Sequence, residues 1–308
     1  GLAYQGTGKK EILEILKPLT KDEDSDVRRG AAIGIGLAYQ GTGKKGLEAL
    51  KTLTKDEEWA MRYGAAIGIG LAYQGTGKKE ILEILKPLTK DEDSYAREGA
   101  AIGIGLVYQG IGNSIVLETL RPLGIEISSY IRRAMAIGIG LAFQKTGNKL
   151  AFKTLISLKK FSDSIVLEGI AIGLGLTFQE VGKIALRSLR SLAKRNDLFA
   201  SPAAILGLGL VYKGTKVKGL KVFYPLTRDL SFVINEGAAI GIGLAYQGSG
   251  ELGLNILKGL IKDESISVRE GAAIGIGLTQ QEKGELTFGL LHYALYRTTS
   301  SDLFIIFI

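Results

Sequence analysis

A ten-residue glycine-rich motif recurs along this chain at a nearly constant spacing, and that spacing constrains the fold more than any local pattern. A clear copy is Ala31-Ala32-Ile33-Gly34-Ile35-Gly36-Leu37-Ala38-Tyr39-Gln40. Counted from the glycine before Leu-Ala-Tyr, the copies begin at Gly1, Gly36, Gly70, Gly105, Gly140, Gly175, Gly209, Gly243 and Gly277. A fixed period of this size is typical of a repeat protein. We therefore predict one all-α array of about eight helix-turn-helix repeats over residues 1–297, followed by a C-terminal tail or cap at 298–308.

The first helix of each repeat is predicted from apolar residues at helical spacing. In the first copy these residues lie between positions 12 and 19, after Thr7, which is a candidate N-cap. Pro18 stands near the end of this stretch, and proline removes a backbone donor and clashes with the preceding turn. We expect it to kink or end the helix.

The second helix carries the glycine-rich motif and is expected over about residues 26–40. The acidic turn before it offers Asp24 or Ser25 as its N-cap. Gly41 follows the helix and is well placed to end it in the left-handed conformation. We therefore predict two antiparallel helices in each repeat.

Small residues occupy two opposite flanks of this second helix. Gly30, Gly34 and Ala38 share one flank, and Ala32 and Gly36 share the other. Each helical glycine costs about 0.8–1 kcal/mol relative to alanine, so close packing on both flanks must offset the cost. We predict that the flanks face the second helices of the preceding and following repeats, while Ile33 and Leu37 pack on the first helix. The second helices would then form a tight inner layer of a strongly curved α-solenoid, a toroid or a horseshoe.

Three stretches carry a resemblance to a known family: Gly-Leu-Ala-Tyr-Gln-Gly-Thr-Gly at 36–43, Leu-Lys-Pro-Leu at 85–88 and Gly-Ala-Ala-Ile-Gly-Ile-Gly-Leu at 99–106. With them the chain resembles the proteasome/cyclosome repeat family, which includes the large non-ATPase scaffold subunits of the proteasome regulatory particle. The resemblance implies a toroidal α-solenoid in the cytoplasm or nucleus that docks proteasomal subunits or ubiquitin-like proteins and has no catalytic centre. Ser-Val-Arg-Glu-Gly-Ala-Ala at 267–273 also resembles a HEAT repeat.

Two copies are unusually alike, since residues 1–25 are identical to residues 70–94. Such identity indicates recent duplication, an unusual lineage or design. The chain opens inside the motif and has no initial methionine, so we expect a fragment, and no targeting signal is present in it.

Positive charge is concentrated between residues 180 and 230, where ten cations stand against three acids, a net +7 of the +8 carried by the chain. The candidate partner-binding residues are Lys183, Arg187, Arg190, Lys194, Arg195, Lys213, Lys216, Lys218 and Lys221. They could form a basic face for an acidic protein or nucleic acid, or simply a solvated outer helix. No aromatic or glycine-rich nucleic-acid motif accompanies them, which disfavours nucleic acid.

The chain has few residues of the types that catalytic and metal sites require. The chain has no cysteine and a single histidine, His292, so catalytic triads and multi-histidine metal sites are excluded. Gly41-Thr42-Gly43-Lys44-Lys45 superficially resembles a phosphate-binding loop, but position 38 is alanine and no Ser or Thr follows the lysine. No apolar run is long enough to span a membrane. We expect no enzyme, cofactor, metal or membrane segment.

Two functions stay open on the sequence. One is a non-catalytic scaffold of the proteasomal type, and the other is a generic HEAT-like binding module, natural or designed, that uses the basic face. The recurring Tyr39-Gln40 pair could either line one rim of the array as a binding ladder or close the packed end of the second helix.

Overall fold

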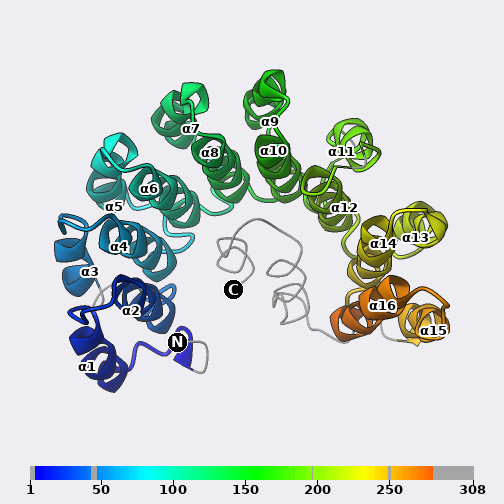
Figure 1. Cartoon of the computed structure of the whole chain (residues 1–308), viewed down its shortest axis with the longest axis horizontal. Helices are drawn as coiled ribbons and strands as arrows, with labels where there is room; N and C mark the ends of the chain where they lie inside the picture. The colour runs from blue at the N-terminus through cyan, green and yellow to red at the C-terminus, as the bar shows by residue number, and fades with distance from the viewer. Residues whose placement is uncertain (1–3, 43–46, 183, 196, 249–250, 280–308) are drawn as a thin grey trace. The chain divides into compact units, whose positions relative to one another are not determined.

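The computed structural model describes residues 4–42, 47–182, 184–195, 197–248 and 251–279, and within these ranges all regular secondary structure is helical. The chain divides into two compact units, Gly1–Leu158 and Lys159–Ile308. In each unit short odd-numbered helices alternate with longer even-numbered ones (Figure 1). The predicted all-α repeat is confirmed, while a single array over residues 1–297 and its toroidal or horseshoe closure stay predictions. The expected tail or cap at 298–308 lies outside the described residues.

The N-terminal unit contains two layers of helices. The odd-numbered layer is α1 (Lys10–Leu19), α3 (Leu47–Leu53), α5 (Lys79–Leu85), α7 (Ser114–Leu120) and α9 (Lys149–Ser157). The even-numbered layer is α2 (Ser25–Ala38), α4 (Trp59–Ala72), α6 (Ser94–Val107) and α8 (Ser129–Ala142). The 3-10 helices η2 (Lys86–Lys90), η3 (Arg121–Ile125) and η4 (Leu158–Phe161) follow α5, α7 and α9. Successive even-numbered helices pack against one another, and α1, α3, α5 and α7 each pack on the even-numbered helix that follows.

The C-terminal unit repeats this arrangement. Its even-numbered helices are α10 (Ser164–Thr177), α12 (Ala200–Val211), α14 (Phe232–Ala245) and α16 (Ile266–Thr279). Its odd-numbered helices are α11 (Leu186–Ala193), α13 (Val217–Phe223) and α15 (Glu251–Leu260), with the 3-10 helix η5 (Tyr224–Arg228) directly after α13. Here too each even-numbered helix packs against the next, and each odd-numbered helix packs on the even-numbered helix that follows it.

Glycines bring successive even-numbered helices into backbone contact. A Cβ atom on Gly105 of α6 would lie 2.6 Å from the Cα of Gly138 of α8, and one on Gly243 of α14 would lie 2.5 Å from the Cα of Gly275 of α16. No side chain fits at such distances. Gly105 and Gly243 occupy the same place in their repeats as Gly36, and Gly138 and Gly275 occupy the place of Gly34. One glycine flank therefore contacts the other flank in the next repeat, which confirms the prediction of two small flanks.

The odd-numbered helix packs close to a glycine of the even-numbered helix that follows it. A Cβ on Gly138 would lie 3.2 Å from Leu120 Cδ1 of α7, so the odd-numbered helix inserts a leucine toward this glycine. The leucine at the position of Leu37 instead turns to the preceding even-numbered helix, since Leu106 Cδ1 would lie 3.1 Å from a Cβ on Gly70. This position thus approaches the preceding even-numbered helix, and the packing of Ile33 and Leu37 on the first helix stays a prediction.

The ends of the second helix are as predicted. Asp24 caps α2, since its Oδ1 accepts hydrogen bonds from the backbone N–H of Asp26 at 2.7 Å and of Val27 at 3.3 Å. Gly41 follows the helix with φ +67°, in the left-handed region. Thr7, in contrast, does not cap α1, because the helix begins three residues later and the Thr7 hydroxyl donates to the Tyr4 carbonyl at 2.9 Å.

Proline ends the α-helical part of several odd-numbered helices. Pro87, Pro122 and Pro225 each stand at the second residue of the 3-10 helix that follows an α-helix, whereas Pro18 stays inside the last turn of α1. A 3-10 turn does not need the amide donor that proline lacks at this position. Proline thus ends the α-helix at these three sites, whereas at Pro18, where a kink or an end is predicted, α1 runs one residue further, to Leu19.

The Gly-Thr-Gly loop at 75–77, which follows α4, caps the even-numbered helix of the next repeat. The backbone N–H of Gly75 donates to the carbonyl of Leu106 at 3.0 Å, and that of Gly77 donates to Val107 at 2.8 Å. Both glycines have positive φ, +66° and +60°. The last carbonyls of a helix have no partner within it, so the loop satisfies them from the neighbouring repeat. In the stretch that superficially resembles a phosphate-binding loop, Gly41 makes the equivalent bond to the carbonyl of Leu71 at 3.3 Å, and residues 43–45 lie outside the described ranges.

The recurring Tyr-Gln pair has two separate roles in the N-terminal unit. Tyr39 and Tyr108 are each 2% exposed, and burial raises the pKa of both side chains, as expected for the packed end of a helix. The glutamines, half-buried except for the exposed Gln5, instead form a ladder in which the side-chain amide of one donates to the glutamine of the next repeat, as far as Gln144. The members are Gln5, Gln40, Gln74, Gln109 and Gln144, and the last bond measures 2.6 Å. The ladder joins repeats side by side.

Arginine makes a second connection between repeats. Arg62 Nη1 donates to the carbonyls of Asp56 at 2.8 Å and Glu57 at 2.7 Å, which closes the acidic turn of its own repeat. Its Nε and Nη2 donate to the two carboxylate oxygens of Asp91 in the next repeat, both at 2.8 Å. Such a two-pronged pair fixes geometry as well as charge. Arg28, Arg97, Arg132 and Arg269 close their own turns in the same way.

The start of α12 differs from its prediction. In the sequence, Ser201 followed by Pro202 predicts a serine cap with proline at the first helical position, but α12 begins at Ala200. The cap is Asp197, whose Oδ1 accepts from the N–H of Phe199 at 3.0 Å and of Ala200 at 2.9 Å. Burial raises the pKa of the Asp197 carboxyl, but the hydrogen bonds from Ser164 of α10 and from the two amides outweigh burial, so the pKa lies below its ordinary value.

Asp197→Asn is therefore expected to destabilise the C-terminal unit by about 1 kcal/mol at pH 7. A carboxyl with a lowered pKa in the folded state stabilises the fold above the unfolded-state pKa, and this contribution is lost as pH falls through the folded-state pKa. Urea unfolding of both proteins from pH 7 down to pH ~3 should show the difference shrinking below the ordinary value of 3.8. A difference that stays constant with pH would contradict a role for the charge.

Candidate partner-binding surface

The first group of predicted cations lies on and just after α11. Arg187 and Arg190 belong to the helix, Lys194 is its C-cap, and Arg195 follows; all four side chains are exposed. The leucines on the other face of α11 are buried against α12, which holds the basic face outward. Lys183 lies outside the described residues.

The second group surrounds α13. Lys218 and Lys221 are exposed on the helix, and Lys213 is half-buried at the end of α12. Lys216 has φ +53°, and its backbone N–H donates to the carbonyl of Ala245 at 2.8 Å, the same bond that loop glycines make in other repeats. The backbone of Lys216 thus has a structural role while its side chain remains exposed.

Both groups belong to odd-numbered helices of the C-terminal unit, and we call the described exposed members the basic surface. It consists of Arg187, Arg190, Lys194, Arg195, Lys216, Lys218 and Lys221. Within the part of the chain that the structure describes, none of these side chains forms an ion pair. The acids nearby are occupied: Asp197 caps α12, and Asp229 Oδ1 accepts from the N–H of Ser231 at 3.0 Å. The surface therefore presents an uncompensated positive field.

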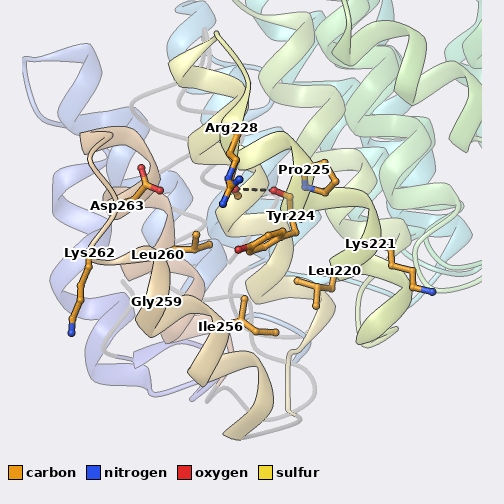
Figure 2. A pocket seen from close by; sticks show the side chains of 11 residues that line it. Leu220, Lys221, Tyr224, Pro225, Arg228, Ile256, Gly259, Leu260, Lys262 and Asp263 are labelled. Atoms are coloured by element: carbon orange, nitrogen blue, oxygen red, sulfur yellow. Dashed lines mark hydrogen bonds between the residues drawn. The ribbon is translucent and has the colours of Figure 1, made fainter.

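Two hollows lie beside the basic surface. The larger, about 860 Å³, separates α13 and η5 from α15. Figure 2 shows its apolar side chains in the middle, with Lys221 and Lys262 toward opposite edges and Arg228 above. The smaller, about 390 Å³, lies between the end of α11 and the start of α14 and includes Lys194 and the fully exposed Leu230. Three cations of the segment thus border a recess: Lys194, Lys221 and Arg228.

Other kinds of site were sought in the described ranges. Over residues 4–42, 47–182, 184–195, 197–248 and 251–279, no three His, Cys, Asp or Glu side chains gather as a metal site would require. None of the helices in these ranges combines the length and apolarity of a membrane span. His292 lies outside the described residues.

The glycines of α4 and the turn that follows carry the link to a known family. Gly68 meets the backbone of α2, Gly70 meets that of α6, and the acidic turn at 91–93 leads into α6. Residues 64–98 match the proteasome/cyclosome repeat. The match spans one proteasome/cyclosome repeat of the array, from the middle of α4 into α6.

Comparison of structures shows the same fold in other proteins. A chain in the complex of CpcE and CpcF of phycocyanin lyase from Nostoc sp. PCC7120 superposes with a TM-score of 0.51 at 14% identity, covering 87% of this chain and 94% of that one. YibA of Escherichia coli superposes with a TM-score of 0.50 at 16% identity, covering 86% and 92%. At such identities the likeness concerns the HEAT-like helical-repeat fold. The chain matches no curated protein by sequence.

Sequence reasoning located the basic surface but missed the larger hollow. Arg228 is one of the ten cations between residues 180 and 230 but is not among the nine candidate partner-binding residues, and Lys262, Tyr224 and Ile256 carry no prediction. When the copies of the repeat are aligned with one another, Gly259 stands at the position of Pro87, Pro122 and Pro225. That replacement was the available signal, because a glycine in place of a recurring residue marks a local change of surface.

Proposed function

We propose that this chain is a non-catalytic protein-binding module whose basic surface contacts an acidic partner protein. The observation that carries the proposal is the row of exposed cations on and beside α11 and α13, which form no ion pair with any described residue, in a segment where two of the three acids, Asp197 and Asp229, are used in helix caps and turns. Such a surface attracts and orients an acidic partner, and the attraction weakens with salt.

A non-catalytic role is supported by how the recurring polar residues are used. Arg62 and its counterparts close turns, Asp24 and Asp197 cap helices, and the glutamine ladder joins repeats. These groups stabilise the repeats and are satisfied by one another. The likeness to a chain in the structure of the complex of CpcE and CpcF supports a protein as partner.

A proteasome regulatory-particle scaffold is the second candidate, because residues 64–98 match the proteasome/cyclosome repeat. In that role the chain would dock proteasomal subunits or ubiquitin-like proteins in the cytoplasm or nucleus. The two candidates differ in what they require of the basic surface, because only the first depends on its charge.

Charge reversal of the basic surface tests the first candidate. The variant Arg187→Glu/Arg190→Glu/Lys194→Glu should lose at least about 10-fold of the wild-type retention of acidic proteins on the immobilised full chain at ~0.15 M salt. The matched control reverses three exposed lysines of the N-terminal unit, Lys79→Glu/Lys86→Glu/Lys90→Glu. Retained proteins are identified by mass spectrometry from a eukaryotic extract.

The outcomes separate the candidates. Loss in the first variant but not in the control supports an acidic partner at the basic surface. Proteasomal ATPase subunits or ubiquitin-like proteins retained equally by both variants would favour the regulatory-particle role instead. Equal retention of the same proteins by all three chains, with none of those subunits among them, would overturn the basic surface as a binding site.

A further inference from the structure

We propose that the hollow between α13 and α15, hereafter the groove, binds an acidic amphipathic helix of another protein. Its apolar residues would lie on Leu220, Tyr224 and Ile256, and its carboxylates would meet Lys221, Arg228 and Lys262. The inference rests on the proposed function and extends the contact from the basic surface to α15.

The groove has an apolar floor that the fold leaves accessible. Leu220 and Ile256 are half-buried, Tyr224 is 43% exposed, and Leu260 closes the bottom at 8%. Figure 2 shows these side chains gathered between the two helices, with Pro225 at the η5 wall. A volume of about 860 Å³ lies within the range of cavities that hold a ligand or several side chains. A trough between helices suits the apolar face of a helix.

The charges around the groove favour an occupant with negative charge. Lys221, Arg228 and Lys262 are exposed at its edges and form no ion pair with any residue that the structure describes. The acid in the lining is Asp263, whose Oδ1 accepts from the N–H of Ser265 at 2.9 Å. Its carboxylate is thus held by the turn before α16. Three cations against one occupied acid favour a negatively charged helix.

Gly259 supplies an independent observation. It lies in the last turn of α15, and a Cβ placed on it would meet no heavy atom within 4 Å. Glycine is disfavoured in helices, and the packing of this chain does not require one here, unlike at Gly105 or Gly243. The missing side chain leaves the α15 backbone open at the groove, where a bound helix can approach it closely.

The test uses fluorescence polarisation of labelled synthetic peptides with the full chain at ~0.15 M salt. The probe is an acidic peptide with leucines at positions i, i+3, i+4 and i+7 and glutamates at most other positions. A scrambled peptide of the same composition lacks this spacing, and a third peptide has glutamates without leucines. The probe should bind at least about 10-fold more tightly than either control peptide.

Two variants locate the binding. A Cβ on Gly259 would meet no heavy atom within 4 Å and leucine is the better helix former, so Gly259→Leu should keep or raise the wild-type Tm while weakening the probe at least about 10-fold. Arg228→Glu should weaken it to a similar degree. The matched control is Lys258→Glu, an exposed residue next to Gly259 that does not line the groove, with an expected change below about 3-fold.

Each other outcome would contradict the groove as the binding site for an acidic helix, and the outcomes can be told apart. Equal affinity for all three acidic peptides would leave the basic surface as the binding site and exclude the groove. Absence of binding to any acidic peptide would overturn the groove and the proposed function together. Concentration-dependent dimerisation of the chain, abolished by Gly259→Leu, would assign the groove to a second copy of the chain.

Discussion

Gly105→Ala is expected to lower the free energy of unfolding of the N-terminal unit by about 3 kcal/mol or more. The added methyl group would lie 2.6 Å from both the Cα and the carbonyl oxygen of Gly138, so α6 and α8 would have to move apart. A side chain cannot relieve this clash by changing rotamer, because the atoms in the way belong to the backbone. Urea unfolding monitored by circular dichroism, with hydrogen exchange of the α6 and α8 amides, measures the loss.

The matched control makes the same substitution at Gly30. A Cβ there would meet no heavy atom within 4 Å, so Gly30→Ala should stabilise α2 by about 0.5–1 kcal/mol through helix propensity alone. If the free energy of unfolding falls in Gly105→Ala and rises in Gly30→Ala, close backbone approach is established as the reason for the glycine motif. If Gly105→Ala were as well tolerated as Gly30→Ala, the backbone contact between α6 and α8 would be disproved.

Arg62→Leu is expected to cost about 3–5 kcal/mol. The substitution leaves Asp91, whose side chain is 11% exposed, as a nearly buried carboxylate without its partner. It also releases the carbonyls of Asp56 and Glu57, which the guanidinium holds in the turn before α4. The hydrogen bond to Asp91 raises the pKa of Arg62 more than burial lowers it, so the charge persists throughout the accessible pH range. Urea unfolding gives the loss in stability.

Arg28→Leu provides the comparison for Arg62. Arg28 closes its own acidic turn through the same two carbonyl bonds, but its partner in the next repeat, Glu58, has a side chain that is 53% exposed. Exposed ion pairs contribute about 0–1 kcal/mol, so Arg28→Leu should cost clearly less than Arg62→Leu. Similar losses would mean that turn closure, and not the pair with Asp91, is the main contribution of this arginine.

The features that the sequence predicted correctly depend on spacing along one helix. The two small flanks of the second helix, the Asp24 cap and the left-handed Gly41 all follow from residue order within a single repeat. The Ser201-Pro202 prediction failed because proline is tolerated throughout the first helical turn, so Asp197 could begin α12 earlier. Local patterns of this kind fix which residues can cap a helix without fixing which one does.

The missed features depend on how repeats are aligned against one another. The bond from Arg62 to Asp91, the glutamine ladder and the docking of Leu106 on Gly70 all join residues of neighbouring repeats. Their geometry follows from the offset between stacked helices, which the period alone does not supply. Predicting the groove from the sequence would also have required the spacing between α13, η5 and α15. The order of apolar and basic residues does not reveal where these elements leave a recess.

The loop glycines that cap the neighbouring helix have a consequence for how such a chain can change its length. The identical segments 1–25 and 70–94 make the same bonds to their neighbours: Gly6 donates to Leu37 at 3.0 Å, as Gly75 does to Leu106. At every repeat boundary of this kind, backbone N–H groups of the loop donate to carbonyls at the end of the next even-numbered helix. Unequal recombination between equivalent positions would therefore yield a longer or shorter chain in which each new junction already has its partners.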